Sequence, residues 1–289
     1  MDQLVFTQKD VADFINTNYV ALKMDGDTEL GNALRKQFKV PGYPTMILFA
    51  ADGQEIDRIV GFSGKKDEYF QILKDYTNGI NTLHDLLSKN GSDANSAQLN
   101  FDIATKYSDR GNDELALQYF ENVLALEPDK NSKIYLESEY NVAESKTFSR
   151  DDPLYLQQYA KNCRNEYLQY YAYSSLVRFF RLKKDQPNVI ATYEEALSKL
   201  PENASMMNSY AWYIFQNRVS NYYERGIAVA RKAVALEPEA DSIWDTLGQL
   251  LFAAGYTKEA IIAMQKAVEL APDETSYQEN LERYKASQS

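Results

Sequence analysis

The sequence predicts two kinds of structure in succession, an α/β segment over residues 1–78 and an all-helical array over residues 79–289. Two observations predict this division. Short apolar runs typical of strands alternate with amphipathic helical patterns only in the first 80 or so residues. Beyond them helical patterns are interrupted by prolines 128, 201, 238 and 272, of which the last three lie 37 and 34 residues apart. Repetition at that period is typical of stacked helical repeats.

The α/β segment opens with a predicted helix and a predicted strand. Thr7 precedes Asp10, and Val11 and Phe14 recur at helical spacing, so we expect an amphipathic helix capped by Thr7. The apolar run 19–22 predicts a strand that is covered on both faces.

A second helix and a second strand follow. Apolar residues at helical spacing from Leu30 through Leu34 to Phe38 predict the helix, and Pro41 ends it. The apolar run 45–49 then predicts a strand.

A hairpin and a closing helix complete the segment. Asp52-Gly53 is a dipeptide typical of tight hairpins, so we expect the chain to return as a strand over residues 56–60. The apolar face of the closing helix is formed by Tyr69, Ile72, Leu73 and Tyr76.

The helical array contains four recognisable copies of one motif. A copy over residues 170–201 is weak, and a copy over residues 210–238 has about three extra residues between its helices, near 220–223. Residues 132–166 predict a further degenerate helix pair, residues 274–289 a solvated cap helix, and residues 80–88 a linker helix. The two clearest copies carry Tyr107, Gly111, Ala116, Phe120 and Pro128, and Trp244, Leu247, Gly248, Gly255, Ala260, Ala267 and Pro272.

This motif resembles the tetratricopeptide repeat, although Leu251 stands where an aromatic residue is usual and Met264 replaces Phe. The resemblance implies a superhelix whose groove binds a protein or peptide partner. A clamp for a carboxylate tail, found in some tetratricopeptide co-chaperones, would need Lys and Asn on the first helices. The corresponding positions hold Phe101 and Thr105 in one copy and Asp245 and Gln249 in another, which argues against such a clamp.

The α/β segment resembles the C-terminal two thirds of the thioredoxin fold. The resemblance rests on the run Val40-Pro-Gly-Tyr-Pro-Thr45, the strand after it, the hairpin and Gly61. Members of that family have a cis X-Pro bond at the place of Tyr43-Pro44. The resemblance therefore implies that Tyr43, Pro44 and Thr45 contact an extended peptide beside the family's redox centre.

The sequence lacks that redox centre, because residues 1–162 contain no cysteine. Thiol–disulfide exchange needs an attacking thiolate and usually a resolving thiol. The family's central strand, which would lie between the runs 19–22 and 45–49, is also missing. We therefore hypothesise an N-terminally shortened piece with Met1 internal to a longer protein. The alternative is a natural domain that has repaired its sheet by other means.

Composition narrows the function classes further. A net charge of −11 argues against general nucleic-acid binding, and no apolar run is long enough to span a bilayer. One cysteine excludes an internal disulfide and a multi-thiolate zinc site. His84 has no second histidine to share a metal, so we expect it on the surface or on the linker helix. We expect no metal, no cofactor and no catalytic residue in this chain.

Two features of the array, the aromatic run 167–173 and Cys163, allow both a functional and a structural interpretation. The aromatic run 167–173 would suit a sticky peptide groove, but aromatic residues also fill the space between packed helices, and packing is favoured. Cys163 lies near Lys161 and Arg164, which would favour a reactive thiolate, but a small packing residue is the commoner role.

The sequence therefore predicts a protein-interaction scaffold built on tetratricopeptide repeats, with a thioredoxin-like segment that is redox-inactive as written. The alternative is a fragment of a thiol–disulfide oxidoreductase whose dithiol lies upstream of Met1. The branch that the segment resembles is bacterial and commonly exported, which would make the parent protein periplasmic.

Overall fold

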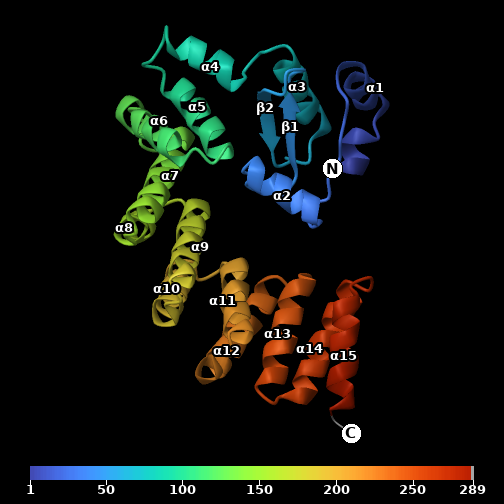
Figure 1. The fold of residues 1–289 in the computed structure, drawn as a ribbon. Helices are drawn as coiled ribbons and strands as arrows, with labels where there is room; N and C mark the ends of the chain where they lie inside the picture. Colours follow the sequence, from blue (N-terminus) through green and yellow to red (C-terminus); the bar gives the residue numbers. More distant parts are fainter. Residues whose placement is uncertain (288–289) are drawn as a thin grey trace. The chain divides into compact units, whose positions relative to one another are not determined.

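The computed structural model describes residues 1–287, which form two compact units divided between Ser149 and Arg150. The first unit (Figure 1) contains η1 (Asp2–Phe6), α1 (Lys9–Asn18), α2 (Glu29–Gln37), β1 (Thr45–Phe49), β2 (Glu55–Val60), α3 (Lys66–Thr77), α4 (Leu83–Asn90), α5 (Ala97–Asp109), α6 (Asp113–Leu126) and α7 (Lys133–Arg150), the last ending at the division. The second contains α8 (Leu154–Asn162), α9 (Glu166–Leu182), α10 (Gln186–Lys199), α11 (Ala204–Gln216), η2 (Ser220–Tyr222), α12 (Tyr223–Leu236), α13 (Asp241–Ala253), α14 (Thr257–Leu270) and α15 (Thr275–Ala286).

The sheet of the first unit consists of two antiparallel strands joined by the predicted hairpin. Thr45 pairs with Val60 and Leu48 with Asp57, and the register shifts by one residue after Leu48. Gly53 turns the chain with a φ of +84°, a conformation that glycine adopts without a steric penalty. The predictions of β1, the hairpin and β2 are confirmed.

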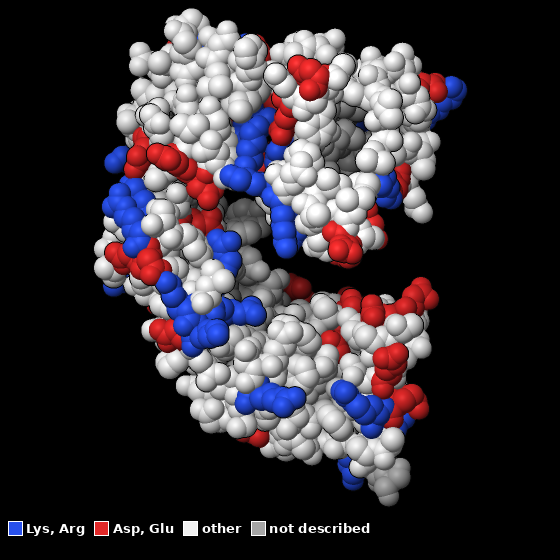
Figure 2. Space-filling model, viewed as in Figure 1, with Lys and Arg blue, Asp and Glu red and all other residues white. Residues whose placement is uncertain are grey.

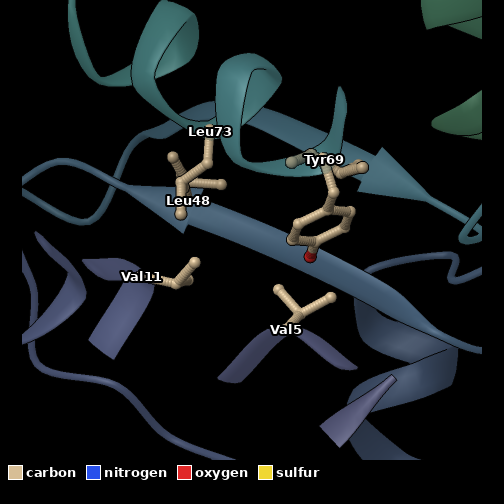
Figure 3. Close-up of a cluster of buried hydrophobic side chains, with 6 residues drawn as sticks. Val5, Val11, Leu48, Tyr69 and Leu73 are labelled. Atoms are coloured by element: carbon tan, nitrogen blue, oxygen red, sulfur yellow. The ribbon is translucent and has the colours of Figure 1, made fainter. Parts of the chain in front are cut away.

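A small hydrophobic core holds this sheet to the helices around it. Leu73 from α3 lies against Leu48 of β1, and Tyr69 from α3 points toward Val5 of η1, with Val11 of α1 in the same cluster (Figure 3). All five side chains are buried. The periodicity of the closing helix thus predicted its buried face, except that Ile72, which was expected on that face, is exposed.

The predicted strand over residues 19–22 is wrong. The segment has no regular secondary structure, and the side chains of Val20 and Leu22 are 101% and 80% exposed. A strand is stabilised by pairing, and the only sheet in residues 1–287 pairs β1 with β2 and with nothing else.

The predicted Thr7 cap is also wrong. Residue Gln8 precedes the first turn of α1, and the Thr7 hydroxyl donates instead to the carbonyl of Gln3, 2.8 Å away. Thr7 ends η1 in a helical conformation, so its side chain is directed back along η1 and is not available to cap α1.

Helices α5 and α6 form the first repeat, after the short helix α4, which begins slightly later than the predicted linker helix. Ala104, Ala116, Phe120 and Val142 form their common core with α7. Residues 79–149 belong to the same compact unit as the α/β segment, and the domain boundary at residue 78 remains a prediction.

The second unit is a series of helix pairs in which α11, α13 and α15 are packed one against the next. Each of α12 and α14 packs against the helices that flank it in sequence. Gly248 explains the close approach of α13 to α14, because an added Cβ would lie 3.2 Å from Met264 Cε. The extra residues predicted near 220–223 form η2, ahead of α12.

No helix within residues 1–287 has the length and apolar character needed to cross a bilayer.

Candidate peptide-binding surfaces

The loop before β1 is the first candidate surface. The Tyr43–Pro44 peptide bond is cis, as the thioredoxin-like resemblance implies. The carbonyl of Pro44 accepts a hydrogen bond from the Gly61 amide at 2.8 Å, and the Thr45 hydroxyl donates to the Gly42 carbonyl at 2.7 Å. These bonds fix the loop at the end of the sheet.

The loop exposes the residues that were predicted to contact a peptide. Pro44 is exposed, Thr45 is half-buried, and the Tyr43 side chain is 59% exposed. The phenol of Tyr43 packs on Gly26, where an added Cβ would lie 2.1 Å from the Tyr43 hydroxyl oxygen. A peptide-binding role for these three residues remains a prediction.

A buried carboxylate connects β2 to α4 and α5. Asp57 is fully buried, and its oxygens accept hydrogen bonds from Lys106 Nζ and Arg110 Nη2, each at 2.7 Å. They also accept from the backbone amides of Arg58 and Leu83, at 2.7 and 2.8 Å. Two cations and two amides therefore satisfy the charge that burial would otherwise penalise.

Two arginines link this charged cluster to Glu55, of which Arg58 is buried and Arg110 is half-buried. Arg58 donates to both oxygens of Glu55 and, through Nη1, to the carbonyls of Phe38 and Asp109. Nη2 of Arg110 also lies 3.1 Å from Glu55. Lys and Arg side chains gather where α2, β2 and α5 meet (Figure 2).

A carboxyl group with an altered pKa lies beside the cluster. Burial raises the pKa of Asp109 to about 6, and the negative charge of Asp57 acts in the same direction. The cations of Lys106, Arg110 and Arg58 oppose the shift. Asp109 is thus half-protonated near pH 6.

In the second unit, α11 presents a partly exposed polar and aromatic stripe. Asn208, Trp212 and Phe215 are spaced at i, i+4 and i+7, which places them on one side of the helix, and all three are half-buried. The rings of Trp212 and Phe215 lie 5.4 Å apart. The remaining faces of α11 carry the fully buried residues Met207, Tyr210, Ala211 and Ile214.

The positions of this stripe recur, with different side chains, one repeat earlier and one repeat later. Its equivalents lie 34 residues before, on α9, and 37 residues after, on α13. The guanidinium of Arg181, on α9, lies 5.8 Å from the ring of Tyr213, so α9 and α11 are in contact at this point. The stripe residues of the two neighbouring helices are Ser174, Arg178 and Arg181 on α9, and Asp245, Gln249 and Phe252 on α13.

The stripe on α13 is acidic at one end. Both oxygens of Asp245 accept from Gln249 Nε2 at 2.9 Å, while burial and the charges of Asp241 and Glu274 raise the pKa of Asp245. Phe252 stacks on Tyr284 of α15 with ring centroids 4.1 Å apart.

The motif residues of the two clearest copies lie in corresponding places of their helix pairs. Ala116, Phe120, Leu247, Gly248, Ala260 and Ala267 are buried between helices, and Tyr107 and Trp244 are half-buried. Trp244 Nε1 donates to the carbonyl of Pro238 at 2.8 Å. Gly111 and Gly255 turn the chain between the paired helices with φ of +60° and +88°, and the exposed Pro128 and Pro272 follow the second helices.

The aromatic run of α9 is only partly used in packing, because one of its four tyrosines is buried, Tyr170 is half-buried and two are exposed. Tyr173 is buried and its hydroxyl contacts Glu195, whereas Tyr167 and Tyr171 are exposed and contact each other through their hydroxyls at 3.2 Å. Cys163 ends α8 and is half-buried, with its sulfur 3.4 Å from the Tyr159 hydroxyl. His84 is exposed in the first turn of α4. Within residues 1–287 no three His, Cys, Asp or Glu side chains gather as a metal site would require.

Two family models match the chain. Residues 1–77 match the thioredoxin-like domain, and residues 241–274, which hold α13 and α14, match the tetratricopeptide repeat. The chain therefore carries a thioredoxin-like domain followed by tetratricopeptide repeats. Both resemblances noted in the sequence, and the fold class that they implied, are confirmed.

Solved structures similar to this chain are tetratricopeptide proteins or share their fold. The C-terminal part of a tetratricopeptide repeat-containing protein from Cytophaga hutchinsonii is 16% identical with a TM-score of 0.54, over 75% of this chain and 83% of that one. MamA is 16% identical with a TM-score of 0.46, over 63% and 94%. YrrB, described as a tetratricopeptide protein with an unusual peptide-binding site, is 10% identical with a TM-score of 0.46, over 67% and 96%. No curated protein matches the chain.

The charged cluster and the stripe were not predicted from the sequence. The stripe is detectable in the sequence, because its three positions recur with the repeat period. The sequence prediction considered only two of these positions, as candidates for a carboxylate clamp. Asp57 had no signal, since its partners Lys106 and Arg110 lie about 50 residues away along the chain.

Proposed function

We propose that this chain is a protein-binding scaffold in which the first helices α9, α11 and α13 of the tetratricopeptide repeats bind a peptide segment of a protein partner. The single observation that carries the proposal is the stripe on α11. Trp212 and Phe215 remain partly exposed although the other faces of that helix are buried. Repeat proteins use equivalent positions of successive units to build one continuous binding surface.

The stripe has the composition of a peptide-binding surface. Trp and Arg are the residues that contribute most binding energy in protein interfaces, and Trp212 and Arg181 lie on neighbouring helices. Asn208 Oδ1 is buried and has no hydrogen-bond partner among the described residues. This oxygen is closed to solvent in the free chain, so a backbone N–H of a bound peptide would supply that partner only after the Asn208 side chain rotates.

The loop of the thioredoxin-like domain is a second proposed contact. Tyr43 and Pro44 are exposed, and Thr45 lies at the start of β1. A partner that bound this loop as well as the repeats would bind more tightly than through either contact alone, because the first contact raises the effective concentration at the second.

A selection of random dodecapeptides displayed on phage, against the full chain, tests the role of the stripe. We expect selected peptides to bind the full chain, and Trp212→Ala to weaken them at least tenfold. The matched control is Ile262→Ala on α14, a second helix, where the replaced side chain is 64% exposed. Peptides that bind Trp212→Ala as tightly as the unaltered chain, or lose equal affinity in Ile262→Ala, would contradict the proposal.

The alternative function is thiol–disulfide exchange, which the thioredoxin-like domain favours. The 289 residues contain one cysteine, Cys163, and it lies in the repeats. We therefore infer that the 289-residue chain does not catalyse exchange by itself, and that such activity would need a dithiol supplied by other residues or another protein.

A further inference from the structure

We propose that the pocket where α2, β2 and α5 meet binds an oxyanion, either a carboxylate or a phosphate group. This site lies in the first unit and is independent of the peptide-binding role proposed for the repeats. The pocket has a volume of about 310 Å³. It is lined by Gln37, Phe38, Lys39, Glu55, Arg58, Tyr107, Arg110 and Asn112.

The charges of the lining favour an anion. Lys39 follows α2, Arg58 lies on β2 and Arg110 follows α5, and all three line the pocket. Glu55 is the single carboxylate in the lining. Behind them the buried Asp57 accepts hydrogen bonds from both Lys106 and Arg110, at 2.7 Å each. With Lys106 included, three cations therefore contact the two carboxylates of Glu55 and Asp57, and Lys39 adds a fourth, so an excess of positive charge remains. Figure 2 shows Lys and Arg side chains at the surface of this region, and of the three lining cations Lys39 is exposed, Arg110 is half-buried and Arg58 is buried.

Glu55 does not use all the donors of the three cations. Its oxygens accept hydrogen bonds from Nε and Nη2 of Arg58, and one of them lies 3.1 Å from Nη2 of Arg110. Nη1 of Arg110 donates to the Lys106 carbonyl, but Nε of Arg110 has no acceptor among the described residues. Guanidinium groups with unused N–H bonds are well suited to a planar carboxylate or to a phosphate.

Lys39 supplies further unused donors. Its ammonium makes one hydrogen bond, to the Gly111 carbonyl at 3.2 Å, which leaves two N–H bonds without an acceptor among residues 1–287. Lys39 has a φ of +49°, a left-handed conformation that is uncommon for a residue with a Cβ. Its aliphatic stem lies beside Gly111, whose added Cβ would meet Lys39 Cδ at 3.2 Å. The exposed ammonium is thus tied by one hydrogen bond to the rim of the pocket.

The start of α6 adds a weaker contribution. Asn112, which caps this 14-residue helix, lines the pocket. The positive end of the helix dipole favours negative charge there, in the same sense as the three cations.

An NMR titration of the full ¹⁵N-labelled chain at constant ionic strength tests the site. The probes are inorganic phosphate, N-acetylglycylglycine with its free carboxylate, and the C-terminal amide of the same dipeptide. We expect at least one anion to give saturable shifts of the Lys39, Gly111 and Asn112 amides, and the neutral amide to give none. The anion that saturates at the lower concentration identifies the source of the oxyanion.

Variants at two lysines of the same region separate a site from general charge attraction. We expect Lys39→Gln to lower the affinity for the anion about tenfold and Lys39→Arg to preserve it. Lys36→Gln, which alters an exposed residue of α2 outside the pocket, should change the affinity little. Shifts that fail to saturate with either anion, or equal losses in Lys36→Gln and Lys39→Gln, would overturn the proposal. If Lys39→Gln does not fold, loss of binding in a folded Lys39→Arg overturns it as well.

Discussion

At the scale of single residues, the Asp57 carboxylate is the fully buried ionic contact between the thioredoxin-like sheet and the first repeat. We expect Asp57→Asn to lower the free energy of unfolding of the first unit by about 3 kcal/mol, because the buried Lys106 would lose its counter-charge and Arg110 would keep only Glu55. Urea denaturation followed through the NMR signals of β2 and α5 measures the loss. Asp27→Asn, which alters an exposed carboxylate, is the control. An equal effect of the two substitutions would contradict the role of Asp57.

Asp109 makes the stability of the same region depend on pH. Its pKa is raised to about 6 by burial, so folding favours the protonated carboxyl. That stabilising contribution is complete below the unfolded pKa near 4 and is lost as the pH rises through about 6. The shift corresponds to a loss on the order of 2–3 kcal/mol.

We expect the free energy of unfolding of the first unit to fall between pH 4 and 8, and to fall more steeply in the unaltered chain than in the Asp109→Asn variant. Urea denaturation at a series of pH values, followed through the signals of α5, measures both slopes. Parallel slopes for the two proteins would show that Asp109 is not the titrating group.

At the scale of elements, the hairpin and the helix pairs were predictable because their signals are local. Asp52-Gly53 specifies a tight turn, and the buried faces of α3 and α13 follow from helical periodicity. The strand expected over residues 19–22 failed for the opposite reason. An apolar run becomes a strand only if another strand pairs with it, and the neighbouring β1 pairs with β2 alone among the described residues.

The turn between paired helices is an element that the repeats share. Gly255 has a φ of +88° and open space around its Cα, so Gly255→Ala introduces backbone strain without a clash. We expect a loss of about 1 kcal/mol, measured by urea denaturation through the fluorescence of Trp212 and Trp244 in the same unit. Gly111→Ala should lower the free energy of unfolding by more, because its added Cβ also approaches Lys39. Urea denaturation followed through the NMR signals of α5 and α6 measures that loss. A smaller loss for Gly111→Ala would contradict this difference.

At the scale of the whole molecule, the thioredoxin-like domain and the repeats are expected to serve binding rather than redox catalysis. We expect the 289-residue chain to reduce insulin disulfides no faster than free thiol, because Cys163 is the single thiol and thiol–disulfide exchange usually needs two. The matched control is Cys163→Ser, which should behave identically. Turnover above free thiol that persists in Cys163→Ser would contradict this account.

The central claim, that α9, α11 and α13 bind a protein partner, is tested most directly by site-specific photo-crosslinking in cells. The photoreactive residue p-benzoylphenylalanine replaces Phe215 on the stripe in one sample and Ile262 on α14 in the other. We predict a discrete protein adduct from position 215 that is lost when Trp212→Ala is added, and no matching adduct from position 262. The same adduct from both positions, or an adduct at 215 that survives Trp212→Ala unchanged, would contradict the claim.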